Sequence, residues 1–292
     1  MPLILNVEAD ELLYRAAFAT EKQGYKLITH QGAIRDFGNR YTKTQILTKI
    51  KQLNLQNYTL AGYKIVEPLE HALYLIKRNI QKFKTIGIPK LWLSPSDKSN
   101  FRFNIAVTPG PKGAGYKANR PTKPIYYNEI REYLIKQHGA EEIHGYEADD
   151  ALGIYQTDNS VAVHIDKDIA MIQGKHLHWI KNERYIVETE LGELPQNDKR
   201  GTGKAFFFHQ MLTGDNVDNI PGIPKIGPIK ATKLLSKAKT ELEMLDIVSE
   251  LYYNEYKDEY KNKLLEIANL LYIVDNKMCR GEGYLKNLCR SL

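Results

Sequence analysis

The sequence predicts an α/β fold with a central, mainly parallel sheet flanked by helices and a helical region at the C-terminal end. Short apolar runs typical of buried parallel strands lie at residues 3–7, 91–93 and 161–165, and a further strand is expected at 185–187. Stretches with helical spacing lie between the first two runs, at 46–53 and 71–80. This alternation of strands and helices is typical of a parallel sheet.

The composition indicates a globular protein with a basic surface. The 292 residues are 42% hydrophobic and 26% charged, so the chain can bury a substantial core. Lys and Arg number 41 against 35 Asp and Glu, a net charge of +6 with a pI near 9.0. Because both signs are abundant, this excess favours a polyanionic partner only where the charges are segregated in space.

The sequence shows no recognisable targeting signal, and its cysteine usage is typical of a cytoplasmic protein. Cys279 and Cys289 have neither metal-ligand spacing nor the pattern of a disulfide framework. The chain begins directly in an apolar, strand-like run, and no apolar run approaches the roughly 20 residues that a membrane-spanning helix needs. We therefore expect a cytoplasmic monomer that contacts no membrane.

Two glycine-rich segments divide the chain. Residues 108–115 hold two Pro and three Gly, which predicts a tightly turned or mobile loop. A polar, glycine-rich stretch at 196–203 suggests a boundary between a core domain, 1–195, and a helical C-terminal region, 196–292.

Carboxylates cluster where the predicted strands end. Asp97 follows the second strand, and Asp166 and Asp168 close the third. Further acidic residues open a predicted helix at 148–155 or follow an apolar helix, namely Glu147, Asp149, Asp150, Asp215 and Asp218. Because the carboxyl ends of parallel strands meet at one edge of a sheet, we expect these side chains to converge there.

The spacing of these carboxylates suits the binding of hard cations. Residues two apart at a strand end face the same side, as Asp166 and Asp168 would, and residues three apart on a helical turn do the same. The second rule pairs Glu147 with Asp150 and Asp215 with Asp218. Oxygen ligands favour Mg²⁺ or Mn²⁺, and two such ions about 4 Å apart activate water for phosphodiester hydrolysis. Taken alone, Asp149 and Asp150 are typical of helix capping, so the hypothesis depends on the joint pattern.

A second motif predicts a grip on a nucleic-acid backbone. Gly222 and Gly227 bracket a tight turn, and Pro228 begins an amphipathic helix with Ile229, Lys233 and Leu234 at helical offsets. The glycines let backbone N–H groups approach closely, and the free helix N-terminus can hold a phosphate oxygen. An ordinary helical hairpin is the alternative interpretation.

These segments resemble the 5′-nuclease superfamily, which includes flap endonucleases, the 5′-nuclease domains of bacterial DNA polymerase I and bacteriophage 5′-exonucleases. The resemblance covers most of the chain. It is carried by residues 145–150 (GYEADD), 164–168 (HIDKD) and 214–235, and more weakly by 97–102.

The resemblance implies a PIN-like nuclease core with two metal ions and a helix-three-turn-helix grip on duplex DNA. One Mg²⁺, with Mn²⁺ as substitute, would lie near Asp97, Glu147 and Asp149. The other would lie near Asp150, Asp166, Asp168, Asp215 and Asp218. The grip also implies a K⁺ site at its turn. The residues that it implies contact DNA are Gly222, Ile223, Lys225, Gly227, Lys230 and Lys233.

The segment Tyr116-Lys-Ala-Asn-Arg120 resembles the family's Tyr-Lys-x-x-Arg motif, in which the Lys and Arg contact the scissile phosphate. Lys117 and Arg120 also have the right charge to stabilise a phosphate beside an acidic pocket. Arg15 stands where family members carry an Arg after the first strand. Solvated cations on a loop are the alternative.

The chain departs from the family pattern at two places. Where relatives read Val-Asp-Gly, this chain reads Val7-Glu8-Ala9-Asp10, so either Glu8 or Asp10 would replace the usual metal-binding Asp. Between Arg120 and Glu147 there is room for one helix, at 128–137, and not for a long two-helix arch. A short bridge or open groove favours exonucleolytic trimming.

The sequence thus predicts a 5′–3′ exonuclease or flap endonuclease that acts in DNA replication or repair on 5′ flaps, nicks and free 5′ ends. The motif spacing resembles that of bacteriophage enzymes, which work in the host cytoplasm. Two alternatives stay open. The altered motif at Glu8 allows a non-catalytic protein that binds branched DNA, and the chemistry allows RNase H activity on RNA–DNA hybrids.

Overall fold

The computed structural model describes residues 2–97, 99–105, 115–118, 120–196, 199–275 and 279–289. The chain forms two compact units. The first comprises residues 1–11, 83–122 and 138–292, and the second comprises 12–82 and 123–137. The predicted loop at 108–115 lies outside the described residues except for Gly115.

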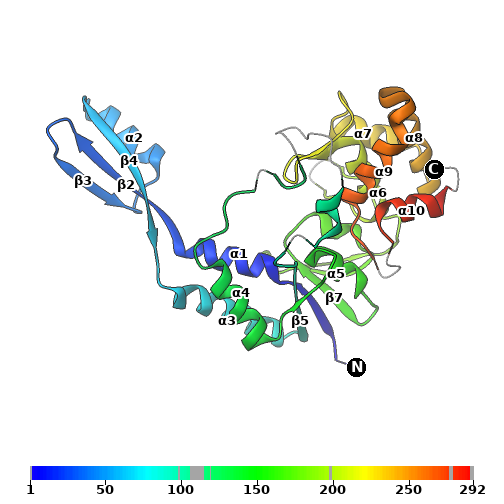
Figure 1. Ribbon diagram of the computed structural model, residues 1–292, viewed down its shortest axis with the longest axis horizontal. Coiled ribbons are helices and arrows are strands. Elements are labelled where there is room, and N and C mark those ends of the chain that lie inside the picture. Colours follow the sequence, from blue (N-terminus) through cyan, green and yellow to red (C-terminus); the bar gives the residue numbers. More distant parts are fainter. Residues whose placement is uncertain are drawn as a thin grey trace. The chain divides into compact units, whose positions relative to one another are not determined.

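The first unit is built on a six-stranded sheet (Figure 1). Its strands lie side by side in the order β6 (Glu141–Glu142), β5 (Ile88–Leu93), β1 (Ile4–Glu8), β7 (Ser160–His164), β8 (Gly174–His178) and β9 (Glu183–Val187). All neighbouring strands are parallel except β8 and β9. The predicted α/β class with a mainly parallel sheet is confirmed, and all four predicted strands are present.

The central strands are buried because both faces of the sheet are covered. Leu5 and Val7 of β1 and Val163 of β7 are fully inaccessible to solvent. Helix α5 (Ala148–Ile154) packs against β1, β5 and β7. Continuous apolar runs therefore form these strands, as expected for a parallel sheet with two covered faces.

The C-terminal helices share one hydrophobic core with the sheet. They are α6 (Gly203–Thr213), α7 (Pro228–Leu235), α8 (Glu241–Tyr256), α9 (Tyr260–Leu271) and α10 (Gly281–Leu288). Helix α6 is buried almost throughout, because its Phe206-Phe207-Phe208 run has apolar neighbours on all sides. The compact units therefore differ from the regions 1–195 and 196–292 expected from the sequence.

Shorter elements connect these helices to the sheet. They are the 3₁₀ helices η1 (Phe101–Asn104), η2 (Asp168–Met171) and η3 (Lys257–Glu259), and the two-stranded hairpin β10 (Gly214–Asp215) with β11 (Ile220–Pro221).

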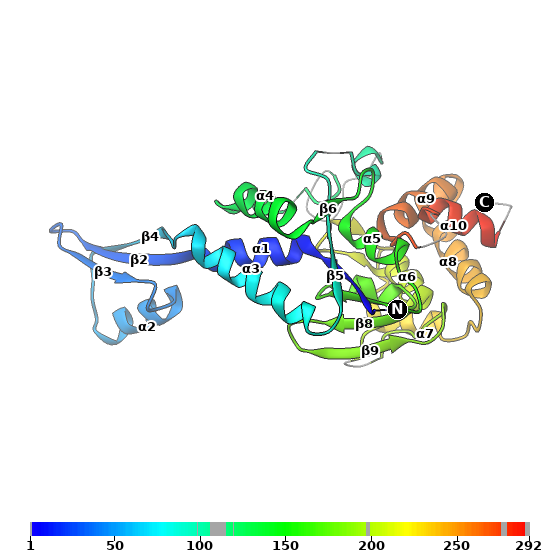
Figure 2. The same cartoon turned by 90° about the horizontal axis from the view of Figure 1, so that it is seen from below.

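The second unit holds a separate antiparallel sheet in the order β3 (Ile34–Gly38), β2 (Glu21–Thr29) and β4 (Tyr58–Val66). Helix α2 (Lys43–Gln52) packs on one face of this sheet (Figure 2). The boundaries between the units fall within α1 (Ala9–Thr20) and α3 (Leu69–Lys84) and close to the end of α4 (Tyr127–His138). The helices predicted at 46–53, 71–80, 128–137 and 148–155 are all present.

Within the described part of the chain, no helix combines the length and the apolar character that a membrane crossing demands.

Candidate active site

Carboxylates of the first unit converge where β1 and β7 end and α5 begins. Glu8 is the last residue of β1, Asp149 lies in the first turn of α5, and Asp166 follows β7. The carboxylates of Glu8 and Asp149 lie close enough to act on each other, and a proton on one of them would allow a hydrogen bond between them. The charge of Asp166 acts on both side chains.

The carboxylates of this first group repel each other when they are ionised. Burial, followed by the charges of Asp149, Glu11 and Asp166, raises the pKa of Glu8 well above its ordinary value. Burial, opposed by Lys117 and reinforced by Asp166 and Glu147, raises the pKa of Asp149 to about 7. Oε2 of Glu8 is buried and has no hydrogen-bond partner among the residues that the structure describes. Either a shared proton or a bound cation is therefore needed to stabilise this pair of carboxylates.

A second carboxylate group comprises Asp166, Asp168 and Asp215. The backbone N–H of Asp168 donates to Oδ1 of Asp166 at 2.9 Å, and Nε2 of Gln210 donates to Oδ1 of Asp168 at 2.7 Å. Nζ of Lys167 lies 3.1 Å from Oδ2 of Asp215.

The electrostatic balance of this second group differs from residue to residue. Burial and the charge of Asp166 raise the pKa of Asp168 to about 8, against the opposing effect of Lys167. Burial also opposes ionisation of Asp215, but Lys167 outweighs it and lowers the pKa of that carboxyl. Asp166 links the two groups, because its charge acts on Glu8 and Asp149 as well as on Asp168.

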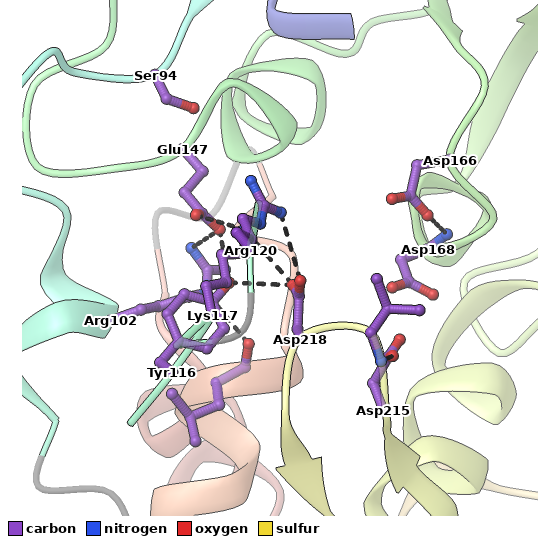
Figure 3. Close-up of polar contacts among 12 residues, drawn as sticks. Ser94, Arg102, Tyr116, Lys117, Arg120, Glu147, Asp166, Asp168, Asp215 and Asp218 are labelled. Carbon is purple, nitrogen blue, oxygen red and sulfur yellow. Dashed lines mark hydrogen bonds and ion pairs between the residues drawn. The ribbon is translucent and has the colours of Figure 1, made fainter. Parts of the chain in front are cut away.

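A third group combines Glu147 and Asp218 with three potential phosphate-binding side chains (Figure 3). Nζ of Lys117 lies 2.6 Å from Oε1 of Glu147 and 3.5 Å from Oδ2 of Asp218. The Tyr116 hydroxyl donates to Glu147 at 2.9 Å, and Nη2 of Arg120 lies 3.3 Å from Asp218. The sequence-predicted trio thus lies together beside an acidic pocket.

In this third group, opposite charges stabilise each other. Burial opposes ionisation of Glu147, but Lys117 and Arg102 outweigh it and hold its pKa at about 2. Burial likewise disfavours a charged Lys117, but Glu147, Tyr116 and Asp218 raise its pKa well above the ordinary value. Lys117 and Glu147 are therefore both ionised at neutral pH.

Backbone contacts hold Lys117 in this position. Its N–H donates to the carbonyl of Asp218 at 3.1 Å, and Nδ2 of Asn219 donates to the carbonyl of Gly115 at 3.0 Å. Lys117 adopts a left-handed backbone conformation with φ of 55°, which an L-residue adopts only where its surroundings hold it there. The segment 115–118 is thus fixed to the turn between β10 and β11.

The structure places Asp150 in a buried ion pair with Arg102. Nη1 and Nη2 of Arg102 donate to its two carboxylate oxygens at 2.6 and 2.8 Å. These oxygens also accept the backbone N–H groups of Glu147 and Val274. Both oxygens are therefore engaged in a fully buried ion pair, which gives Asp150 a structural role. Its expected role as a metal ligand stays a prediction.

The expected pairing of Asp215 with Asp218 is also wrong. Asp215 ends strand β10, and the following turn leads to β11, so the two residues do not lie on one helical turn. Figure 3 shows Asp215 beneath Asp168, whereas Asp218 lies beside Arg120. Asp218 therefore belongs with the cations of the third group.

Asp10 and Asp97 lie apart from the positions expected for them. Helix α1 begins at Ala9, so Asp10 does not continue the alternation of β1 and instead accepts the backbone N–H of Ser94 at 3.0 Å. Asp97 is exposed in the turn after β5, where its hydrogen bonds with Ser99 lower its pKa. Within the described residues no contact joins Asp97 to Glu147 or Asp149. Arg15 belongs to the second unit, and its predicted role stays a prediction.

The hairpin before α7 is present but differs in detail from the prediction. Ile223 is buried, and its N–H donates to the carbonyl of Leu212 at 2.9 Å, so it is not available to DNA. Gly222 packs against the backbone of Thr213, where a Cβ would lie 2.3 Å from a carbonyl carbon. Gly222 therefore has a packing role, and its predicted backbone contact with phosphate stays a prediction. Ile229 is 88% exposed, so the apolar side of α7 is formed by Ala231 and Leu235 instead.

Other parts of the hairpin remain accessible. Gly227 is the N-cap of α7, and no atom lies within 4 Å of the position that a Cβ would take there. Lys225, Lys230 and Lys233 are exposed. Their contacts with DNA stay predictions.

Several residues of the site were missed by sequence reasoning. Glu11 accepts the N–H of Ile165 at 2.9 Å, and Gln210 and Lys167 contact the second carboxylate group. Nδ1 of His164 lies 2.7 Å from the carbonyl of Asp166 and supports its loop. Arg102 lies in the quoted segment 97–102, and His164 and Lys167 lie in the quoted segment 164–168, so these two segments were the signals that pointed to them.

The donor set fits a hard divalent cation. As they stand, no three His, Cys, Asp or Glu residues in the described ranges are placed to hold a metal ion. The buried, unpartnered oxygen of Glu8 and the raised pKa values of Asp149 and Asp168 nevertheless show a local excess of carboxylate oxygens. Mg²⁺ and Mn²⁺ prefer such ligands and would relieve the repulsion.

No family model matches the chain. The relatives that match parts of it include the following three. The 5′–3′ exonuclease of Buchnera aphidicola subsp. Baizongia pistaciae is 33% identical over 135 residues, 41% of this chain and 43% of the relative. Flap endonuclease Xni of Shewanella piezotolerans is 31% identical over 129 residues, 41% of this chain and 50% of the relative. DNA polymerase I of Rhizobium leguminosarum is 32% identical over 141 residues, 42% of this chain and 13% of the relative.

The chain thus matches half or less of the length of these relatives. A crystal structure of the T5 D15 protein, co-crystallised with metal ions, aligns with 99% of this chain and 97% of its own at 13% identity and a TM-score of 0.42. The sequence matches to exonucleases, a flap endonuclease and DNA polymerase I support the resemblance of this chain to the 5′-nuclease superfamily.

Proposed function

We propose that this protein is a divalent-metal-dependent nuclease that hydrolyses DNA phosphodiesters at 5′ flaps, nicks and free 5′ ends. One observation carries the proposal: repelling carboxylates, of which Glu8 is buried and Asp149, Asp166 and Asp168 are half-buried, lie beside the ionised side chain of Lys117. A site with these charges suits cations on one side and a phosphate group on the other.

The residues that would hold the cations are Glu8, Asp149, Asp166, Asp168 and Asp215. When bound, divalent ions in such a site activate water and stabilise the leaving oxygen of a phosphodiester. Glu8 is the better replacement for the family's first Asp, because its carboxylate interacts with Asp149 while Asp10 accepts the N–H of Ser94.

The third group would bind and orient the scissile phosphate. Lys117 and Arg120 carry positive charge whose present partners, Glu147 and Asp218, lie at the edge of the acidic site. Their donors can stabilise the charge that develops on the phosphate oxygens. The Tyr116 hydroxyl, which donates to Glu147, keeps that carboxylate turned toward Lys117.

The hairpin before α7 would hold the duplex without reading its sequence. Exposed Lys225, Lys230 and Lys233 and the N-terminus of α7 at Gly227 offer contacts to phosphate oxygens. Such binding weakens steeply as salt rises.

A gel assay tests this proposal. A 5′-labelled flap and a matched nicked duplex are incubated with Mg²⁺, Mn²⁺ or EDTA, using the unmodified protein, Glu8→Ala, Asp166→Ala and Asp168→Ala. Asp246→Ala, on the exposed side of α8, is the control. We expect metal-dependent products from the unmodified protein and the control, and no products from the three variants although they still bind DNA. Intact binding without product in any metal would support the non-catalytic alternative.

A further inference from the structure

The net positive charge of the protein is concentrated in one segment of the second unit. Residues 21–66, here called the basic module, run from the start of β2 to the end of β4. They hold 8 Lys and Arg against 2 Asp and Glu, a net charge of +6. The whole chain has 41 Lys and Arg and 35 Asp and Glu, so the residues outside the module hold 33 of each sign and have no net charge.

We propose that the basic module is a second DNA-binding surface, which contacts the phosphate backbone of duplex DNA. The proposal deepens the proposed function and rests on it for the choice of DNA as the polyanion. It concerns a surface separate in sequence from the carboxylate site and from the hairpin before α7.

The module holds its cations on a folded scaffold. Leu27 of β2 and Ile46 and Ile50 of α2 form a small buried core between the sheet and the helix. On the other face of the sheet, the ring of Tyr63 lies over Gly24, where a Cβ would come within 2.6 Å of it. The basic side chains therefore project from fixed positions, which lowers the entropy lost on binding.

Three of the eight cations are neutralised within the structure. Lys64 pairs with Glu21 at 2.6 Å, and Lys26 pairs with Asp36 at 3.5 Å. Lys22 pairs with Glu67. These residues can contribute little to the attraction of a polyanion.

The other five cations are uncompensated. All are exposed, and within the described ranges none forms an ion pair with a carboxylate: Arg35, Arg40, Lys43, Lys49 and Lys51. They lie on β3, on the turn that follows it and on α2. A surface with five cations that form no ion pair among the described residues is the electrostatic footprint of a nucleic-acid contact.

Aromatic rings fix two of these cations in place. The guanidinium of Arg35 lies 5.4 Å from the ring centroid of Phe37, and Nζ of Lys49 lies 4.0 Å from that of Tyr41. The two rings themselves meet edge to face at 6.2 Å. The result is a continuous row, from β3 to α2, of Arg35, Phe37, Tyr41 and Lys49.

This row favours contacts with phosphates over stacking with bases. Both rings are partly buried against the module's core, and cations occupy their faces. An open aromatic face, which single strands use for stacking, is therefore not what the row offers. A duplex presents phosphates at high density, and each one that a cation neutralises releases counterions.

Salt dependence of binding provides the test. We would measure the affinity of the full chain for a labelled blunt-ended 20-base-pair duplex by fluorescence anisotropy, in EDTA, between 50 and 200 mM salt. The test variant is Arg35→Gln with Lys43→Gln and Lys49→Gln. The control variant is Arg78→Gln with Lys77→Gln and Lys181→Gln, which are also exposed and change the net charge equally.

We expect the test variant to lose about 0.9 in the slope of log affinity against log salt for each phosphate contact removed, up to about 2.7 for three. The control variant should retain the slope of the unmodified protein. Equal slopes for the two variants would overturn the proposal. A loss confined to single-stranded DNA, or to vesicles containing anionic lipid, would also overturn it.

The measurement separates this proposal from the nuclease assignment because it needs no cleavage. If the protein cuts DNA but the two variants bind alike, the basic module alone is wrongly assigned. If no metal supports cleavage but the test variant loses duplex binding, the nuclease assignment fails and the module stands.

Discussion

The guanidinium of Arg102 donates to both carboxylate oxygens of Asp150, at 2.6 and 2.8 Å, and both side chains are almost completely buried. Arg102 also donates to the carbonyls of Leu270 and Tyr272. The pair therefore connects the beginning of α5, which carries Glu147 and Asp149, to the end of α9. It supports the site from behind, and Nη1 of Arg102 also lies 3.5 Å from Oε2 of Glu147.

Removing one partner of this pair should destabilise the fold. We expect Asp150→Ala to lower the free energy of unfolding by about 3–5 kcal/mol, because the guanidinium would remain buried without a counter-charge. Urea denaturation would measure the loss. The double variant Arg102→Met with Asp150→Leu is the matched control and should recover part of the stability, since apolar side chains can replace a buried pair.

A different outcome would favour the predicted role of Asp150 as a metal ligand. That outcome is a small loss of stability combined with loss of the rise in melting temperature that we expect Mn²⁺ to cause in the unmodified protein.

The carboxylate repulsion should make the metal-free protein less stable as the pH rises. The pKa of Asp168 is about 8 in the fold, against 3.8 for an ordinary Asp. The folded state thus keeps a proton that the unfolded chain releases, and this contribution to stability is lost between about pH 4 and pH 8. We expect Asp168→Asn to flatten the dependence of stability on pH. At pH 8.5 its free energy of unfolding should exceed that of the unmodified protein by at least about 1.4 kcal/mol, the equivalent of one pKa unit.

Thermal and urea unfolding in EDTA across this pH range would check the prediction. Asp246→Asn, at an exposed position on α8, should leave the profile unchanged. Added Mg²⁺ should raise the stability of the unmodified protein at pH 8.5 more than that of Asp168→Asn. A steeper loss of stability in Asp168→Asn would contradict the proposed repulsion.

Lys117 should matter for the chemical step more than for DNA binding. Its ammonium is held 2.6 Å from Glu147 and would stabilise charge that develops on the phosphate. We expect Lys117→Met to slow single-turnover cleavage by roughly 10²–10³-fold, the effect of losing one preorganised donor. Duplex affinity should change much less, because several other exposed cations are proposed to contact the DNA backbone.

The control for this variant is Lys225→Met, on the exposed hairpin, which should weaken binding and leave the single-turnover rate at saturating protein unchanged. Equal effects of the two substitutions on the rate would argue against a role of Lys117 at the reacting phosphate.

The sequence was a good guide to strands with continuous apolar runs and to residues that follow them. Glu8, Asp149 and Asp166 could be found because each lies at the end of a buried strand or the start of a helix. The contacts between side chains of the site could not be found in this way. Lys167 and Asp215 are separated by 48 positions, and only the fold brings them within 3.1 Å.

The antiparallel sheet of the basic module was missed for a related reason. Its strands are half-exposed, and in β4 exposed and partly buried residues alternate for much of its length, so no continuous apolar run marks them. The segregation of charge likewise became visible only when the element bounds were known. The total of +6 does not itself say that one segment carries all of it.

The two glycines of the hairpin before α7 should respond differently to the same substitution. A Cβ on Gly222 would lie 2.3 Å from the carbonyl carbon of Thr213, so Gly222→Ala requires the backbone of the hairpin to shift. No atom lies within 4 Å of the corresponding position at Gly227. We expect Gly222→Ala to lower the free energy of unfolding by more than about 2 kcal/mol, as overpacking does, and Gly227→Ala by less than about 1 kcal/mol. Urea denaturation of both variants measures the difference. If Gly222→Ala were as stable as Gly227→Ala, its glycine would be free of packing contacts, and the contact with phosphate first expected for Gly222 would again be the better explanation.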